Sequence, residues 1–450
     1  MIDDLAARER TSVAEMVGAA VICARKWQPI VDSYIEIADD SAMAAAAAAV
    51  QEGAALSGIP VAVKDNIDVA GMGCTAGSGF FADRIATADA GCVRRLRDAG
   101  AVVIGKTNMH EFAYGATNDN PFFGRCRNPW NLDRISGGSS GGSAVAVATD
   151  SCVAALASDT GGSGRIPAAF CGVTGFRPSH GAITCTRVFP VAWSFDTVSI
   201  MARQVRDVAA VFDVIAGYDP DDARSAREPA AARACGAGTA GANLRIGLVG
   251  TADAADTERE ISAAITSAAD VFDSAGHMVT AVGVPGLGEA FDACDRIMKS
   301  EALAVHLERM ERHPEGFGED IRRRLDLGRR ISAASLAEAY DYQARWIRRI
   351  ENLFDELDIL ILPTVPVSSP PAQGAETLST TAQVARLTYP WSLARVPALS
   401  LPCGHTSEGM PIGMQMVGAR FCEADLFTLG RQYQQSTAWH LLRPPEAVAQ

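Results

Sequence analysis

Two glycine- and serine-rich segments constrain this chain more than any other feature. The first reads Gly-Gly-Ser-Ser-Gly-Gly-Ser over residues 137–143, and the second reads Ser-Asp-Thr-Gly-Gly-Ser-Gly-Arg over residues 158–165. Residues 144–156 between them are rich in Ala and Val and are predicted to form a buried helix. Such a helix would span about 20 Å. Each segment can therefore bring hydroxyl groups and exposed backbone N–H groups to one place.

This composition indicates a catalytic centre for acyl transfer. Glycine accepts positive φ angles and lets a substrate approach the backbone closely, as the oxyanion hole of an acyl-transfer enzyme requires. A pair of flexible linkers is the alternative interpretation. The flanking sequence is apolar and dense, however, and not of low complexity.

Composition excludes several classes of function. The net charge of −13 argues against a nucleic-acid partner, because such partners usually need a basic surface. The eleven cysteines contain no C-x-x-C pair, which is typical of buried small side chains in a reducing compartment and not of a disulfide framework or zinc site. The first residues do not resemble a signal peptide, and no apolar run reaches the roughly 18 residues that span a membrane. We therefore expect a cytoplasmic protein without membrane contact, and a homodimer is kept as a hypothesis.

Buried strands alternate with helical segments along the chain, which favours an α/β fold. The expected strands are residues 58–65, 102–105, 244–249, 278–282, 358–363, 398–403 and 412–417. Helices are expected for residues 107–112 and for most of 288–357. This alternation predicts one large mixed, mostly parallel sheet that is covered on both faces by helices.

The whole chain, residues 1–450, is predicted to form a single domain. Its expected parts are a helical N-terminal cap (1–57, with an Ala-rich tract at 44–50), a core (58–217), a surface connection (218–243) and the remainder of the sheet with its covering helices (244–450).

Acyl transfer requires a nucleophile, a base and donors for an oxyanion. Ser163 is the best nucleophile candidate, because its N–H lies in a run with those of Thr160, Gly161 and Gly162. Ser139 lies in a similar segment, although it could instead cap the following helix.

No histidine lies near either segment, so the base must come from elsewhere in the chain. Lys64 at a strand end is suitable if it is neutral. Lowering the pKa of a lysine from about 10.4 to near 7 corresponds to roughly 4–5 kcal/mol, which burial can supply. Lys106 also follows a strand and is an equal competitor on the residues alone, and a surface role for Lys64 stays open. An ion pair between Asp159 and Arg165 is interpreted as shaping the second segment.

Several motifs in order make the chain similar to the amidase signature family of serine amidohydrolases. They are Val63-Lys-Asp-Asn66, Gly105-Lys-Thr-Asn-Met109, residues 137–143, residues 159–172 and Pro411-Ile-Gly-Met-Gln415. The resemblance implies the amidase signature fold and a Ser-cisSer-Lys triad. Ser163 would be the nucleophile, Ser139 the bridging serine and Lys64 the base, which selects Lys64 over Lys106.

The resemblance also implies the surroundings of the triad. Thr160, Gly161 and Gly162 align with the oxyanion loop of the family, and the acyl pocket is expected at Ala113, Tyr114 and Gly115. The resemblance implies no metal and no cofactor.

Three departures from the family pattern concern the substrate. Gly164 stands where many members carry Ile or Val, Ser199-Ile200 replaces a usual Gly-Pro, and Arg187 replaces a usual small residue. The first two are similar to allophanate hydrolases, whose substrates are small ureido acids. Tyr340 and Arg348 are candidates for anchoring a substrate carboxylate, with ordinary surface positions as the alternative.

The sequence therefore predicts an amidohydrolase that cleaves a small amide through a serine acyl-enzyme. One alternative is the amidase subunit of a tRNA-dependent amidotransferase. Another is an α/β-hydrolase esterase, because Gly137-x-Ser139-x-Gly141 matches a nucleophile elbow, with His405 or His440 as its base.

Overall fold

A computed structural model of the chain describes residues 13–38, 53–227, 243–250, 253–254, 256–374 and 376–445. The Ala-rich tract at 44–50 and residues 228–242 of the expected surface connection lie outside these ranges.

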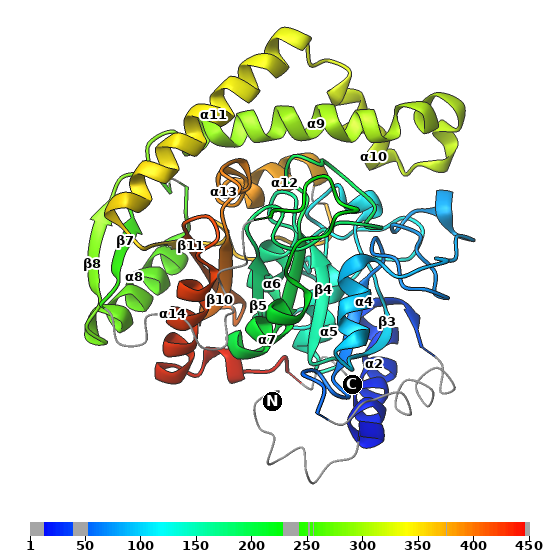
Figure 1. Ribbon diagram of the computed structural model, residues 1–450, viewed down its shortest axis with the longest axis horizontal. Coiled ribbons are helices and arrows are strands. Elements are labelled where there is room, and N and C mark those ends of the chain that lie inside the picture. The colour runs from blue at the N-terminus through cyan, green and yellow to red at the C-terminus, as the bar shows by residue number, and fades with distance from the viewer. Residues whose placement is uncertain are drawn as a thin grey trace.

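The described residues form one 11-stranded sheet in the order β1-β3-β2-β4-β6-β5-β10-β11-β9-β7-β8 (Figure 1). The strands are β1 (Tyr34–Ile37), β2 (Pro60–Lys64), β3 (Val102–Thr107), β4 (Ala154–Ser158), β5 (Thr174–Arg177), β6 (Val198–Ala202), β7 (Arg245–Val249), β8 (Met278–Val282), β9 (Ile359–Pro363), β10 (Ala398–His405) and β11 (Pro411–Gly418). The α/β class and the mixed sheet are confirmed.

The expected predominance of parallel pairs is wrong. Parallel pairs join β2 to β3 and β4 near one end of the sheet, and β7 to β8 and β9 at the other. The pairs from β4 through β6, β5, β10 and β11 to β9 are antiparallel, as is the β1–β3 pair at the edge. Apolar runs buried on both faces suggested parallel strands, but a central antiparallel strand covered by helices is just as apolar.

Helices cover both faces of the sheet, as expected. One apolar core packs α4 (Gly91–Asp98), α7 (Val205–Ile215), α8 (Arg259–Ser274) and α14 (Glu423–Ser436) on one face. Two further cores, on the other side, involve α2 (Val13–Val31), α5 (Gly141–Ala148), α6 (Arg165–Cys171), α9 (Leu287–Arg312), α10 (Glu319–Gly328), α11 (Ala333–Glu356), α12 (Thr377–Ala385) and α13 (Tyr389–Leu393).

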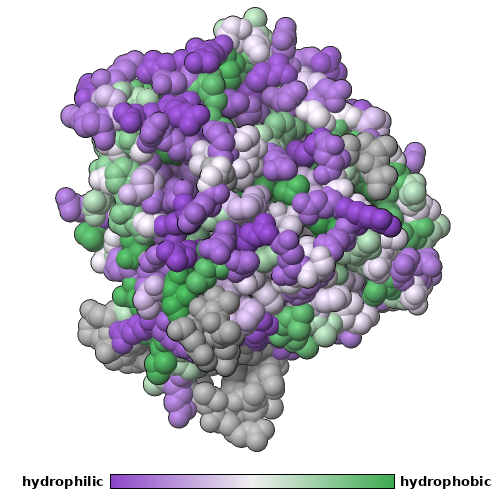
Figure 2. All heavy atoms as spheres, turned by 180° about the vertical axis from the view of Figure 1, so that it is seen from behind, coloured by the Kyte–Doolittle hydropathy of each residue, from purple (hydrophilic) through white to green (hydrophobic). Residues whose placement is uncertain are grey.

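The long helices α9 and α11 lie at the top of the molecule, with α12 and α13 between them and the sheet (Figure 1). Seen from behind, hydrophilic side chains are dense across this upper part of the surface (Figure 2). The expected helices of residues 288–357 are thus confirmed as an outer layer, which η3 (Pro314–Gly316) interrupts.

The predicted helix over residues 144–156 is wrong in its second half. Helix α5 begins earlier, at Gly141, and ends at Ala148, and strand β4 follows from Ala154. The chain turns between them at Asp150, where φ is 55°. A short apolar run does not distinguish helix from strand by its periodicity. The consequence is functional, because the second glycine-rich segment leaves directly from a buried strand.

Two further predicted helices need correction. The N-terminal cap contains α2, but β1 then pairs with β3 as an edge strand. Residues 107–112 were expected to be helical, yet β3 extends to Thr107 and only the 3-10 turn η2 (Glu111–Ala113) follows. Positive φ angles at Phe112 and Ala113 prevent the turn from continuing as a helix.

The start of α6 packs so closely on β6 that only one of two facing positions can carry a side chain. A Cβ atom at Gly164 would lie 2.0 Å from Ser199 Oγ and 2.8 Å from Ser199 Cβ. Ser199 Oγ donates a hydrogen bond to the carbonyl oxygen of Phe176 over 2.7 Å. The two departures are therefore linked, because the Ser199 side chain fills the space that a side chain at position 164 would need.

We predict that Gly164→Ala lowers the free energy of unfolding by roughly 1–3 kcal/mol, because it overpacks this contact. In a Ser199→Gly background the same substitution should cost much less. Chemical denaturation of the two single variants and the double variant measures the coupling. If the two substitutions lowered the free energy of unfolding additively, positions 164 and 199 would not compete for the same space.

Candidate active site

Lys64 lies at the end of β2, and its side-chain nitrogen contacts two hydroxyl groups. Its Nζ donates to Ser139 Oγ over 2.7 Å and to Ser158 Oγ over 2.8 Å. The side chain is fully buried. Burial lowers the pKa of Lys64 well below its usual value, although Asp159 and Asp196 act in the opposite direction. The amine is therefore suited to accept a proton.

The strand register separates Lys64 from its competitor Lys106. Lys64 is paired with Thr107 on β3, whereas Lys106 is paired with Val63. Neighbouring residues of a strand point to opposite faces, so the two lysines face different sides of the sheet. Lys106 Nζ donates to the carbonyl oxygen of Gly73 over 2.8 Å and forms an ion pair with Asp65 at 3.4 Å.

Ser139 lies in the loop before α5, after a cis peptide bond with Gly138. Its hydroxyl accepts the hydrogen bond from Lys64, and its carbonyl oxygen accepts one from the backbone N–H of His110 over 3.0 Å. The residue at the N-cap of α5 is Ser140, and it makes no side-chain capping bond. The structure therefore gives the Ser139 hydroxyl a contact with Lys64 and not a capping role.

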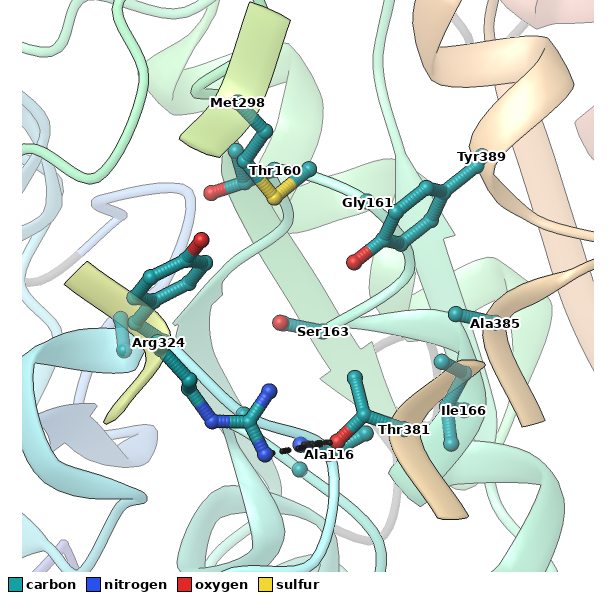
Figure 3. Close-up of a pocket in the computed structure, with 14 residues that line it drawn as sticks. Ala116, Thr160, Gly161, Ser163, Ile166, Met298, Arg324, Thr381, Ala385 and Tyr389 are labelled. Atoms are coloured by element: carbon teal, nitrogen blue, oxygen red, sulfur yellow. Dashed lines mark hydrogen bonds between the residues drawn. The ribbon is translucent and has the colours of Figure 1, made fainter. Parts of the chain in front are cut away.

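Ser163 lies between β4 and α6 and lines a pocket with about 350 Å³ of space, open solvent included. Figure 3 shows its hydroxyl directed toward the middle of this pocket. Among the described residues, none forms a hydrogen bond with Ser163 Oγ, so the hydroxyl is free to meet a substrate. A direct hydrogen bond from Ser163 to Ser139 is not present in the described part of the chain.

The expected oxyanion loop surrounds this hydroxyl, with one difference. The Gly162 amide donates to Asp159 Oδ1 over 2.8 Å and is not available to a substrate. The amides of Thr160, Gly161 and Ser163 have no acceptor among the described residues. Of the four amides in the predicted run, those of Thr160, Gly161 and Ser163 are therefore free, and that of Gly162 is used within the loop.

Asp159 fixes the loop by accepting hydrogen bonds from the amides of Gly162 and Gly164. It is fully buried, and its carboxylate contacts Arg165 Nε at 2.9 Å and Arg177 Nη1 at 3.2 Å. Burial alone would raise the pKa of Asp159, but the two arginines hold it below its usual range. The predicted pair with Arg165 is present, and Arg177 is a partner that the sequence did not reveal.

Asp196 also contacts the loop, and the sequence did not reveal this residue. Its Oδ1 accepts a hydrogen bond from Thr160 Oγ1 over 2.7 Å, and its carboxylate accepts bonds from the amides of Val191 and Ala192. Burial raises the pKa of Asp196 to about 6.

The predicted pocket residues Ala113, Tyr114 and Gly115 do line the pocket. The other lining residues are Ala116, Gly138, Thr160, Gly161, Ile166, Met298, Arg324, Thr381, Ala385 and Tyr389. Arg324 on α10 is buried, and its Cζ lies 5.9 Å from the centre of the Tyr114 ring. It brings a positive charge to the pocket that sequence reasoning did not find, because helical periodicity does not tell which arginine faces inward.

The structure does not bring the two predicted carboxylate anchors to this pocket. The Tyr340 hydroxyl donates to Glu301 Oε1 over 2.8 Å, and Tyr340 is not among the lining residues. Arg348 is 76% exposed on α11 and pairs with Glu351 at 3.2 Å.

The α/β-hydrolase alternative is wrong. Ser139 follows a loop and not a strand, so the nucleophile elbow is absent. His405 packs against Trp130 and Trp439, with ring centres 4.9 Å and 5.8 Å apart. Neither His405 nor His440 bonds to a serine of the glycine-rich segments among the described residues.

The described residues contain neither a cluster of metal-binding side chains nor a membrane-spanning helix. In this part of the chain, His, Cys, Asp and Glu side chains do not gather in threes as a metal site would require. None of the helices there combines the length and the apolar character needed to cross a membrane.

Comparisons with known proteins show the family to which the chain belongs. Residues 15–427 match the Amidase family. The chain is 34% identical to a glutamyl-tRNA(Gln) amidotransferase subunit from Thermosynechococcus vestitus, with 97% of both chains covered.

Solved structures with the same fold include a 6-aminohexanoate cyclic dimer hydrolase complexed with substrate. It is 27% identical, with a TM-score of 0.87 and coverage of 98% of this chain and 96% of that chain. A chain from a vestigial protein complex related to the origins of an s-triazine catabolic enzyme is 30% identical, with a TM-score of 0.87 and coverage of 95% and 96%. The predicted resemblance is thus confirmed, and the chain belongs to the amidase signature family as an amidase, a hydrolase of carbon–nitrogen bonds other than peptide bonds.

Proposed function

We propose that this amidase cleaves a small amide through a serine acyl-enzyme, with Ser163 as nucleophile, Ser139 as bridging serine and Lys64 as base. The observation that carries the proposal is the 2.7 Å contact between Lys64 Nζ and Ser139 Oγ in a fully buried environment. A neutral lysine beside a serine hydroxyl can act as a general base without any histidine.

The proposed reaction has two halves. Ser163 Oγ attacks the amide carbonyl carbon while its proton passes through Ser139 to Lys64, and the free amides of the loop stabilise the oxyanion. The C–N bond breaks when the relay returns the proton to the leaving nitrogen. Water then attacks the acyl-enzyme, gives its proton to the same relay and releases a carboxylate. Ammonia or an amine is the second product.

The pocket supports a small substrate that carries an anionic group. Even with open solvent included, the space between its lining residues is about 350 Å³, so the part of a substrate that it holds is small. Arg324 is the charged side chain among its lining residues, and guanidinium groups recognise carboxylates well. An amide of a dicarboxylic acid fits this description, and so does a small ureido acid such as allophanate.

A second candidate is the amidase subunit of a tRNA-dependent amidotransferase. The near full-length similarity to the glutamyl-tRNA(Gln) amidotransferase chain from Thermosynechococcus vestitus supports it. Such a chain would need partner chains for its complete activity. Amide hydrolysis by the purified single chain would favour the stand-alone enzyme, and activity that appears only with partner chains would favour the assembly.

We expect Ser163→Ala to abolish turnover and to leave the fold unchanged, because it removes only one hydroxyl that has no partner among the described residues. Ser139→Ala should retain more activity, since it removes a proton bridge and not the attacking atom. The measurement is ammonia release from simple amides, with circular dichroism as the check on folding. A folded and active Ser163→Ala enzyme would disprove the nucleophile assignment.

Lys64→Arg should lower kcat/KM by roughly 10²–10⁴-fold, because a guanidinium keeps its proton at any working pH. In the unmodified enzyme kcat/KM should rise with pH through the depressed pKa of Lys64 and then reach a plateau, since only the neutral amine accepts a proton. Lys106→Arg is the matched control and should keep this profile. An active Lys64→Arg enzyme would rule out the lysine base.

Arg324→Gln should raise KM for amides of dicarboxylic acids by about 10–100-fold, the loss expected for a charged hydrogen bond. Arg348→Gln is the matched control, because it removes the same charge from an exposed position outside the pocket. Steady-state kinetics on one anionic amide measures both. Equal effects of the two substitutions would contradict a role of Arg324 in the pocket.

A further inference from the structure

Hydrogen bonds within the protein occupy two of the three guanidinium nitrogens of Arg324. Nε donates to Asp320 Oδ2 over 2.8 Å. Nη2 donates to the carbonyl oxygen of Thr377 over 3.0 Å and to Thr381 Oγ1 over 3.1 Å. Among the described residues, Nη1 has no acceptor, and Figure 3 shows one nitrogen directed toward Ser163. Because the guanidinium is planar, fixing two nitrogens also fixes the direction of the third.

Asp320, which orients this guanidinium, is itself oriented by His110. Its Oδ2 lies 3.0 Å from His110 Nε2, while Oδ1 accepts a hydrogen bond from Thr377 Oγ1. Burial would raise the pKa of Asp320, but the bonds from His110 and Arg324 hold it below its usual range. The carboxylate can only accept, so His110 Nε2 carries the proton of this bond.

His110 is fixed between the pocket wall and the serine loop. It is 1% exposed, and its Nδ1 lies 3.4 Å from Thr117 Oγ1. Its backbone N–H donates to the carbonyl oxygen of Ser139 over 3.0 Å. The ring packs against Gly115, where an added Cβ atom would lie 2.3 Å from Nε2. The imidazole is therefore buried, with a partner at each ring nitrogen and the pocket wall against the ring.

We propose that His110 is a positioning residue for substrate selection, which acts through Asp320 to hold the free nitrogen of Arg324 toward the anionic group of the substrate. This inference rests on the proposed function of Arg324. His110 does not itself touch the substrate, since it is not among the residues that line the pocket.

The test compares two amides of equal length, succinamate with a carboxylate and butyramide without charge. His110→Leu should lower the ratio of kcat/KM for succinamate to kcat/KM for butyramide at least about tenfold, since a misplaced guanidinium forfeits a charged hydrogen bond. The loss should fall on KM for succinamate and not on its kcat. His110→Gln, whose amide N–H can reach Asp320, should restore most of the ratio.

Arg324→Gln in the same assay separates this inference from the proposed function. If Arg324→Gln lowers the ratio and His110→Leu does not, only the role of His110 is overturned. If Arg324→Gln leaves the ratio unchanged, the proposed roles of Arg324 and of His110 in substrate selection are both overturned. An equal loss on both amides in His110→Leu would mean that His110 acts on the serine loop, and it would also overturn the inference.

Asp320→Asn provides a second variant in case His110→Leu does not fold. The aspartate is only partly buried, and asparagine keeps its shape while weakening both bonds. Asp320→Asn should show the same selective loss for succinamate. Where His110→Leu folds, adding it to Asp320→Asn should lower the ratio little beyond Asp320→Asn alone, because both substitutions act on one contact. Independent, multiplied losses would overturn the chain from His110 to Arg324.

Discussion

The carboxylate of Asp159 is the group on which the geometry of the site depends. It is fully buried between Arg165 and Arg177, and it also accepts hydrogen bonds from the amides of Gly162 and Gly164. Removing one partner from such a cluster costs about 3–5 kcal/mol, so the three charges must be buried together. Arg165 extends the cluster to Gln415 on β11. These contacts join a glycine-rich loop to the surrounding core at several points.

The sheet topology explains why Lys64 lies near the segment that carries Ser163. Strands β2 and β4 are parallel neighbours, with Val61 opposite Ala154 and Val63 opposite Leu156. Parallel strands end at the same edge of a sheet, which is where ligands bind in α/β folds. Lys64 therefore reaches Ser158, the serine that ends β4, and the loop that carries Ser163 starts one residue later. The antiparallel pairs elsewhere do not affect this arrangement, since the site needs only one parallel pair.

Sequence reasoning was strongest where the signal is local. The glycine-rich segments and the apolar strands could be found because backbone freedom and hydrophobic runs are written in neighbouring residues. The choice between Lys64 and Lys106 needed the family resemblance, since only the strand register places them on opposite faces. Arg324 and Asp196 could not be found at all. Each reaches the site through tertiary packing, and the exposed Arg348 has the same local sequence character as the buried Arg324.

The electrostatics of the site depend on which groups the carboxylates of Asp159 and Asp196 contact. Among the described residues, Lys64 Nζ forms hydrogen bonds only with hydroxyl groups, although Asp159 and Asp196 are close enough to act on its pKa. Asp159 is neutralised by two arginines, and Asp196 is bonded to Thr160 and to backbone amides. A direct contact with either carboxylate would stabilise the ammonium form and abolish the base. The ion cluster that fixes the loop of Ser163 therefore also occupies the Asp159 carboxylate, which does not contact the lysine.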